Sequence, residues 1–254
     1  MREHDEAPAQ APERARRTRR VGTGSGTTSA VDDGLLWMER LTMKPLIVTD
    51  DTRARTLIEA WLEHMGPEVC DVLAGTGVKI TVLHDAQTFS EVSPALRRLG
   101  ASVDRWPIPP AGLFVVEERS VILRSLSAMT FFHEVGGHAI DLCLGGSVYL
   151  SGVDPRFRRR FAQATSFATP YAASGCDEFW AESARCWWGP IANDPHSLWP
   201  AVSRERLRRI DEDMYELVRW AFEDEIPRMA AAIRARPHWN GDASADHLTA
   251  VRYG

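Results

Sequence analysis

The feature that most constrains the fold is an apolar stretch, Met129–Asp141, that is interrupted by two histidines, a glutamate and two glycines. Its centre reads His133-Glu134-Val135-Gly136-Gly137-His138, within a helical pattern of hydrophobic residues. Two imidazoles a few residues apart on a helix, with a carboxylate directly after the first, are how proteins present two ligands to zinc and a base to its water. This stretch therefore predicts a helix that carries part of a metal site.

The spacing of the two histidines is one residue longer than the usual arrangement. In a regular helix, residues i and i+4 lie about 40° apart, whereas residues i and i+5 diverge by about 140°. A π-type turn absorbs one extra residue and returns both side chains to one face. Gly136 and Gly137 lie where this distortion is needed, and each glycine costs a helix interior roughly 1 kcal/mol relative to alanine. The spacing predicts a π turn between His133 and His138.

Two other interpretations of this stretch stay open at this point. A single histidine on an apolar helix is more often a hydrogen-bonded core residue than a metal ligand. The extra glycine could also have destroyed an ancestral metal site, which would leave a non-catalytic binding module. A suitable carboxylate downstream favours the metal site over both.

A third ligand is expected from a second helix. Ser174, with Asp177 three residues later, resembles a capping box and predicts the start of that helix. Glu178, Glu182 and Arg185 then share one helix face. Mixtures of glutamate and arginine usually face solvent, but pairing with the histidine helix makes Glu178 the candidate ligand.

The remaining carboxylates of these two helices are candidates for orienting a histidine. When one carboxylate ligates a metal, another one turn away can hold a histidine ring from behind. Glu182 is one candidate for this role, and Asp141, one turn beyond His138, competes with it. The opposite face of the second helix is expected in the core and carries Trp180, Ala184, Trp187 and Trp188.

Residues 34–126 alternate helical and extended patterns. Residues 78–83 alternate as a strand does, and residues 113–116 and 121–123 predict a hairpin joined by residues 117–120. One helical pattern in this part is carried by Ile58, Trp61, Leu62 and Met65. We therefore expect a small sheet of mixed or antiparallel strands in the N-terminal half.

From residue 127 to residue 236 the pattern is helical, which makes the fold class α+β, with one domain over residues 34–236. Residues 1–33 hold many Ala, Pro, Arg, Gly, Ser and Thr but few large apolar side chains, and we expect a disordered basic arm. Its arginine cluster is interpreted as a solvated tail. Residues 237–254 are expected to form an irregular tail.

Composition excludes several classes of protein. The chain of 254 residues carries 30 Lys and Arg against 35 Asp and Glu, a net charge of −5 and a pI near 5.9, which argues against nucleic-acid binding. No apolar run approaches the roughly 18 residues that a membrane span needs. Four cysteines without a Cys-x-x-Cys pair fit a reducing compartment. With no signal peptide visible, we expect a soluble, cytoplasmic protein.

Residues 130–188 resemble the catalytic core of zinc metallopeptidases related to anthrax lethal factor and the Pro-Pro endopeptidases, which have the zincin-like, gluzincin-type fold. That family pairs a His-Glu-x-x-His helix with a Tyr and a Glu seven residues apart, and Tyr171 and Glu178 have this spacing. The stretch Glu178–Glu182 and the connecting stretch Leu150–Phe157 are also similar. The longer His-Glu-x-x-x-His spacing is similar to that of dipeptidyl peptidase III, another zinc peptidase.

The resemblance implies that His133, His138 and Glu178 bind Zn²⁺ and that Glu134 accepts the proton of the metal-bound water. It also implies that Tyr171 donates a hydrogen bond to the oxyanion. The strand 121–123, directly before the histidine helix, is expected to offer an edge to an extended peptide.

These expectations together indicate a zinc-dependent metallopeptidase, or an amide hydrolase, that acts on a peptide or a small amide. Two histidines and one carboxylate can also hold Fe²⁺, so an iron-dependent tailoring enzyme on a peptidase-like scaffold is the first alternative. The non-catalytic binding module is the second alternative. The sequence predicts neither the cleavage specificity nor the oligomeric state.

Overall fold

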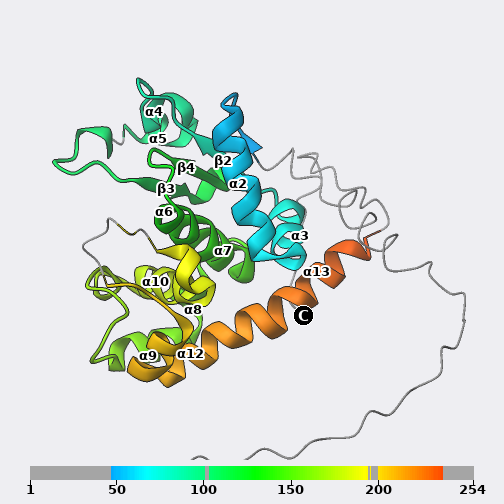
Figure 1. Ribbon diagram of the computed structural model, residues 1–254, viewed down its shortest axis with the longest axis vertical. Coiled ribbons are helices and arrows are strands. Elements are labelled where there is room, and N and C mark those ends of the chain that lie inside the picture. The colour runs from blue at the N-terminus through cyan, green and yellow to red at the C-terminus, as the bar shows by residue number, and fades with distance from the viewer. Residues whose placement is uncertain (1–46, 101–102, 194, 196–199, 237–254) are drawn as a thin grey trace, which may run out of the picture. The chain divides into compact units, whose positions relative to one another are not determined.

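The computed structural model describes residues 47–100, 103–193, 195 and 200–236, which all belong to one compact unit of the chain (Figure 1). The predicted basic arm over residues 1–33 and the predicted tail over residues 237–254 lie outside the described residues. The described part is mixed α+β. Its sheet lies in the N-terminal half and its C-terminal half is helical, as predicted.

The sheet has four strands in the order β1-β2-β4-β3, of which the first three are parallel and β3 is antiparallel to β4. The strands are β1 (Ile47–Val48), β2 (Lys79–Val82), β3 (Gly112–Val115) and β4 (Ser120–Leu123). The predicted hairpin is confirmed, because β3 and β4 pair through the short turn η2 (Val116–Glu118). The prediction of a mixed sheet is therefore confirmed.

The predicted free edge is wrong for the strand 121–123. β4 lies between β2 and β3 and pairs with both, so its backbone groups are already used. All four of its residues are buried, as expected for a strand inside a sheet. Within the described part of the chain, β3 is the strand that leaves an edge unpaired on this side of the sheet.

Twelve α-helices are described, several joined by short 3₁₀ or π turns. The helices are α2 (Thr52–Met65), α3 (Pro67–Gly75), α4 (Phe89–Val92), α5 (Pro94–Leu99), α6 (Ala128–His133), α7 (Ile140–Gly145), α8 (Leu150–Val153), α9 (Pro155–Gln163), α10 (Cys176–Trp188), α11 (Arg204–Ile210), α12 (Glu212–Arg219) and α13 (Ile226–Arg234). The turns are η1 (Val103–Arg105), η3 (Glu134–Ala139), η4 (Tyr171–Ala173), η5 (Gly189–Ala192) and η6 (Trp220–Glu225). Among these described helices, none has the length and apolar character that crossing a membrane requires.

The sheet is covered on both faces. On β4, Val121 and Leu123 face the main core, whereas Ile122 faces a smaller core beside α4 and α5. This alternation is the two-residue period of a strand. Figure 1 shows α4 and α5 on one side of the sheet and α6 and α7 on the other. The histidine helix therefore lies directly against the sheet.

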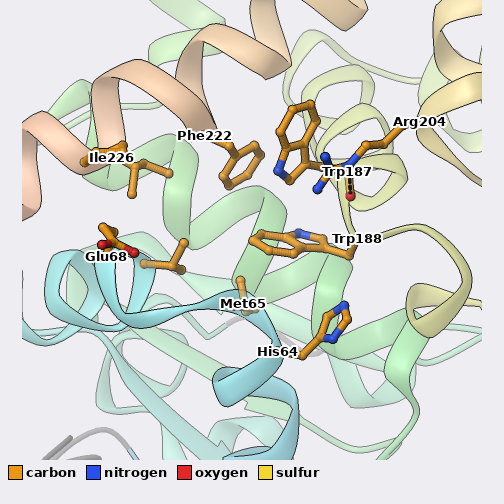
Figure 2. Close-up of a pocket in the computed structure, with 10 residues that line it drawn as sticks. His64, Met65, Glu68, Trp187, Trp188, Arg204, Phe222 and Ile226 are labelled. Carbon is orange, nitrogen blue, oxygen red and sulfur yellow. Dashed lines mark hydrogen bonds between the residues drawn. The ribbon is translucent and has the colours of Figure 1, made fainter. Parts of the chain in front are cut away.

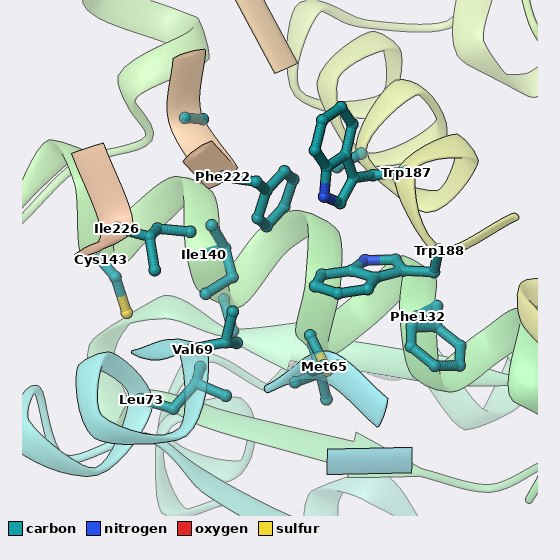
Figure 3. Packing of buried hydrophobic residues seen from close by; sticks show 14 of the residues in the cluster. Met65, Val69, Leu73, Phe132, Ile140, Cys143, Trp187, Trp188, Phe222 and Ile226 are labelled. Carbon is teal, nitrogen blue, oxygen red and sulfur yellow. The ribbon is translucent and has the colours of Figure 1, made fainter. Parts of the chain in front are cut away.

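The main core is rich in aromatic rings, many of which come from α10. The expected core residues Trp180, Trp187 and Trp188 are buried, and all three rings pack against Phe222 of η6. Figure 3 shows Trp187, Trp188 and Phe222 together above Met65 of α2. This packing fixes α10, the predicted third-ligand helix, against the rest of the molecule.

Candidate metal centre

The two histidines lie on one continuous helix that contains the predicted π turn. α6 ends at His133, the π turn η3 follows over Glu134–Ala139, and α7 continues the helix. The rings of His133 and His138 have centroids 4.9 Å apart, at an angle of 85°. The prediction of a π distortion is therefore confirmed, and it brings the two side chains together.

The double glycine is explained by the close approach of α10. A Cβ atom at Gly137 would lie 2.6 Å from Cβ and 2.7 Å from Cα of Ala181. A Cβ atom at Gly136 would lie 2.6 Å from Nε1 of Trp188. The indole N–H of Trp180 donates a hydrogen bond of 3.0 Å to the carbonyl oxygen of Gly137. Neither glycine could carry a side chain without moving its neighbour.

The three predicted ligands converge on one point. Nε2 of His133 lies 3.1 Å from Oε2 of Glu178, and Nε2 of His138 lies 3.4 Å from the same oxygen. The ligand atoms of all three residues lie within 4.8 Å of one another. Tetrahedral zinc with bonds of 2.0–2.1 Å places its ligand atoms about 3.3 Å apart. The separations of 3.1 and 3.4 Å are close to this value.

One oxygen of Glu178 also indicates that a cation would fit between the three ligands. Oε2 of Glu178 is buried, and its contacts with the two ring nitrogens do not have the geometry of hydrogen bonds, so it has no such partner among the described residues. A buried oxygen that bears negative charge and lacks a donor is costly. A metal ion between this oxygen and the two ring nitrogens would satisfy it, so the residues present fit such an ion.

Glu182 contacts the ring nitrogen of His133 that does not face Glu178. Its Oε1 lies 2.8 Å from Nδ1 of His133, and its Oε2 accepts hydrogen bonds from Thr169 (2.7 Å) and Arg185 (2.7 Å). A hydrogen at Nδ1 leaves the lone pair of Nε2 free for the metal position. Thr169 carried no sequence signal that would have identified it.

Two of the three residues on this acidic face of α10 are buried, although mixtures of glutamate and arginine usually face solvent. Glu182 and Arg185 are only 3% and 1% exposed. They pair with each other, and Arg185 also donates to the carbonyl oxygen of Ala192 (3.0 Å). Pairing and hydrogen bonding are what make buried charges tolerable, and the periodicity of a sequence does not show them.

Asp141 does not contact a histidine. Its carboxylate accepts hydrogen bonds from the backbone N–H of Ser151 (2.8 Å) and from the Ser151 hydroxyl, at the start of α8. Burial raises the pKa of Asp141 to about 6. Nδ1 of His138 has no hydrogen-bond partner in the described part of the chain. Of the two candidate carboxylates, Glu182 and not Asp141 therefore contacts a histidine.

Glu134 lies beside the ligands and is shielded from solvent. It is 7% exposed, its Oε2 has no hydrogen-bond partner among the described residues, and burial raises its pKa. A Cβ atom at Gly112 of β3 would lie 2.8 Å from Cγ of Glu134. The absence of a side chain at Gly112 therefore leaves room for Glu134 next to the edge strand, a role the sequence did not reveal.

Tyr171 reaches the metal centre from the turn before α10. Its hydroxyl donates a hydrogen bond of 2.7 Å to Oε1 of Glu178, the oxygen that does not face the histidines. Burial and this carboxylate raise the pKa of Tyr171, so the phenol stays protonated at neutral pH.

The predicted helix start at Ser174 is wrong. α10 begins at Cys176 with Gly175 as its N-cap, and the Ser174 hydroxyl donates to the carbonyl oxygen of Tyr171 (2.7 Å). Ser174 instead closes the turn η4, because its hydroxyl can reach a backbone oxygen three residues back.

A second tyrosine, Tyr149, was missed by the sequence reasoning. Its ring centroid lies 5.6 Å from that of His138 and 6.4 Å from that of Phe114 on β3. Burial raises its pKa, and the nearby carboxylates Glu134 and Glu178 add to the rise. It precedes α8 in a connecting segment, and only the fold brings it beside the histidine helix and the edge strand.

The charges of the centre are strongly coupled. Burial lowers the pKa of His133, but contacts with Glu178 and Glu182 outweigh it and raise the value to about 10. Burial raises the pKa of Glu178, yet the two histidines hold it well below its usual range. Without a metal, positive charge is thus favoured at this point, and a divalent cation can supply it in place of the protons.

Comparison with known proteins adds no relative. No family model matches this chain, and no curated protein matches it either.

Proposed function

We propose that this protein is a zinc-dependent metallopeptidase, or a closely similar amide hydrolase. The observation that carries the proposal is the convergence of two ring nitrogens and Oε2 of Glu178, 3.1 and 3.4 Å apart, beside the buried and unpaired Oε2 of Glu134. Ligand groups and a base in one place are what hydrolysis by a metal-activated water requires. The resemblance in residues 130–188 to zinc metallopeptidases points the same way.

His133, His138 and Glu178 would hold the metal, and three protein ligands leave one coordination position open for water. A bound zinc ion lowers the pKa of such a water to about 7 and polarises the carbonyl group of the substrate. Two imidazoles and one carboxylate suit zinc, and Fe²⁺ is the alternative that the same ligands accept.

Glu134 is the proposed general base. It follows the first ligand directly, and its unpaired oxygen is available to accept a proton. Burial raises its pKa above the usual value of a glutamate, which suits a group that takes a proton from water and then gives it to the leaving nitrogen. Gly112 keeps the edge strand close to this carboxylate without displacing it.

The proposed substrate is an extended peptide that adds to the free edge of β3. Backbone groups along an unpaired strand supply the hydrogen bonds for such an addition. β3 packs beside Glu134 through Gly112, so a peptide on this edge would run past the base. Tyr171 is the proposed oxyanion donor, because its protonated phenol lies next to the ligand Glu178.

The test compares Glu134→Gln with the wild type on a diverse peptide library, with metal content measured by plasma mass spectrometry. We expect the wild type to hold one zinc ion and to cleave peptides, and Glu134→Gln to keep the metal but lose cleavage. Glu117→Gln is the matched control, because Glu117 is an exposed glutamate that pairs with Arg98 at the surface.

Two outcomes would contradict the proposal. Full activity in Glu134→Gln would show that the assigned base is wrong. Stoichiometric iron, together with uptake of dioxygen, would favour the iron-dependent enzyme instead.

A further inference from the structure

A cavity of about 320 Å³ is lined in part by Met65 and Trp188, the two side chains that lie next to Gly136 of the π turn (Figure 2). It is bounded by the end of α2, the start of α3, the end of α10, the start of α11 and the η6–α13 segment. Its lining residues are His64, Met65, Glu68, Val69, Trp187, Trp188, Arg204, Phe222, Ile226 and Pro227. None of the residues placed in the metal centre lines it.

The apolar walls of this cavity are held rigidly by other contacts. The rings of Trp187 and Phe222 are stacked, with centroids 5.8 Å apart at 16°, and Trp188 packs edge-on against Phe222 at 5.0 Å. Trp188 also contacts Phe132 of the histidine helix at 5.7 Å. Trp180 and Tyr215, which do not line the cavity, contact Phe222 and Trp187, each with ring centroids 6.2 Å apart. Because each of the three lining rings is also supported from outside the cavity, the walls cannot easily close on the empty space.

One polar group at the cavity is fixed and has unused donors. Nε of Arg204 donates a hydrogen bond of 2.6 Å to the carbonyl oxygen of Trp187, and the guanidinium lies 3.7 Å above the Trp187 ring. These contacts use Nε and one face of the group. Arg204 is an exposed residue, and within the described ranges no carboxylate forms an ion pair with its two terminal nitrogens. A fixed guanidinium with free terminal N–H groups matches the two oxygens of a carboxylate.

The charge on the opposite side limits which anions fit. Figure 2 shows Glu68 across the cavity from Arg204. Glu68 lies 3.9 Å from Arg234, but Arg234 also pairs with Asp71, so these three side chains keep one excess negative charge. This charge would repel a second negative charge placed at that end, so a dicarboxylate is disfavoured. The volume lies at the lower end of the range for small-molecule sites, which is about 300–1,000 Å³.

We propose that this cavity binds a small monocarboxylate with an apolar or aromatic body, with the carboxylate on Arg204 and the body against Trp188 and Phe222. Apolar walls supply affinity in such sites, and a few polar groups fix the orientation. The proposal concerns a site separate from the metal centre, and it does not depend on the proposed peptidase activity.

The test is calorimetric titration of the metal-free full chain with 3-phenylpropionate, its uncharged amide and the dicarboxylate phenylsuccinate. We expect the monocarboxylate to bind and the other two to bind much more weakly. Hydrogen bonds to a charged group make a difference of roughly 10- to 100-fold in affinity, so Arg204→Gln should weaken binding of 3-phenylpropionate by about that factor. Arg204→Lys keeps the charge but loses the planar guanidinium. Its affinity for 3-phenylpropionate should therefore lie between those of the wild type and Arg204→Gln.

Arg208→Gln is the matched control, because Arg208 lies on the same helix and pairs with Glu212 at the surface. It should bind 3-phenylpropionate like the wild type. Thermal unfolding of each variant checks that the fold is kept. The proposal is overturned if 3-phenylpropionate does not bind, if its amide binds equally well, or if the folded Arg204→Gln protein keeps the wild-type affinity.

Discussion

Replacement of Gly137 by alanine tests whether the close approach of two helices sets the metal centre. The new Cβ would lie 2.6 Å from Cβ and 2.7 Å from Cα of Ala181, whereas carbon atoms in ordinary contact are about 3.5–4.0 Å apart. One of these neighbours is a backbone atom, which cannot rotate away. The π turn and α10 must therefore separate by about 1 Å.

The expected cost appears in both stability and metal binding. Overpacking costs about 1–3 kcal/mol, and the better helix propensity of alanine returns about 1 kcal/mol, so the free energy of unfolding should fall by about 0–2 kcal/mol. Ala181 lies on the same helix as Glu178, one turn away. Metal sites tolerate ligand shifts of only about 0.2 Å, so we expect zinc affinity to fall at least about tenfold.

Zinc affinity is measured by competition with a chromogenic chelator, and stability by urea unfolding of the metal-free protein. Gly152→Ala is the control, because a Cβ atom at this helical glycine would meet nothing within 4 Å. That variant should keep its affinity and gain slightly in stability. A folded Gly137→Ala protein with native zinc affinity would refute the argument that this contact positions Glu178.

Three further predictions concern the same centre. Glu182→Gln removes the charged partner of His133, and at pH 8 it should weaken zinc binding by about 10- to 100-fold in a chelator competition. Tyr171→Phe should lower kcat by about 10²- to 10³-fold at unchanged zinc content if the phenol stabilises the oxyanion; an unchanged kcat would remove that role. Since zinc must displace a proton from His133, whose pKa is raised to about 10, zinc affinity should rise about tenfold per pH unit between pH 6 and 9. Calorimetry at several pH values checks this, and a flat profile would contradict the charge state assigned to His133.

Local patterns in the sequence were sufficient for several parts of the fold and the site. The five-residue step from His133 to His138, with two glycines between them, predicts a π turn because no regular helix can present both rings on one face. The hairpin follows from two short β-rich runs separated by a polar turn. The spacing of Tyr171 and Glu178 also singled out the residues that the structure brings to the histidines.

Other parts depend on which segments meet in three dimensions. Among the described strands, the unpaired edge on this side of the sheet belongs to β3 and not to β4, because β2, from a distant part of the chain, pairs with β4. Asp141 meets Ser151 instead of a histidine, since α8 folds back over α7. Spacing along a helix shows the face on which a side chain lies, but not the partner that covers that face.

The sequence by itself determined the identity of the candidate ligands and the local distortion that lets two of them act together, because both depend on residues within a few turns of one helix. Only the tertiary structure decided why the glycines are needed, which carboxylate holds His133, and that Tyr149 and Gly112 lie beside the centre. These features arise from contacts between segments far apart in the chain. Such contacts are set by the packing of whole helices and strands, which no local pattern records.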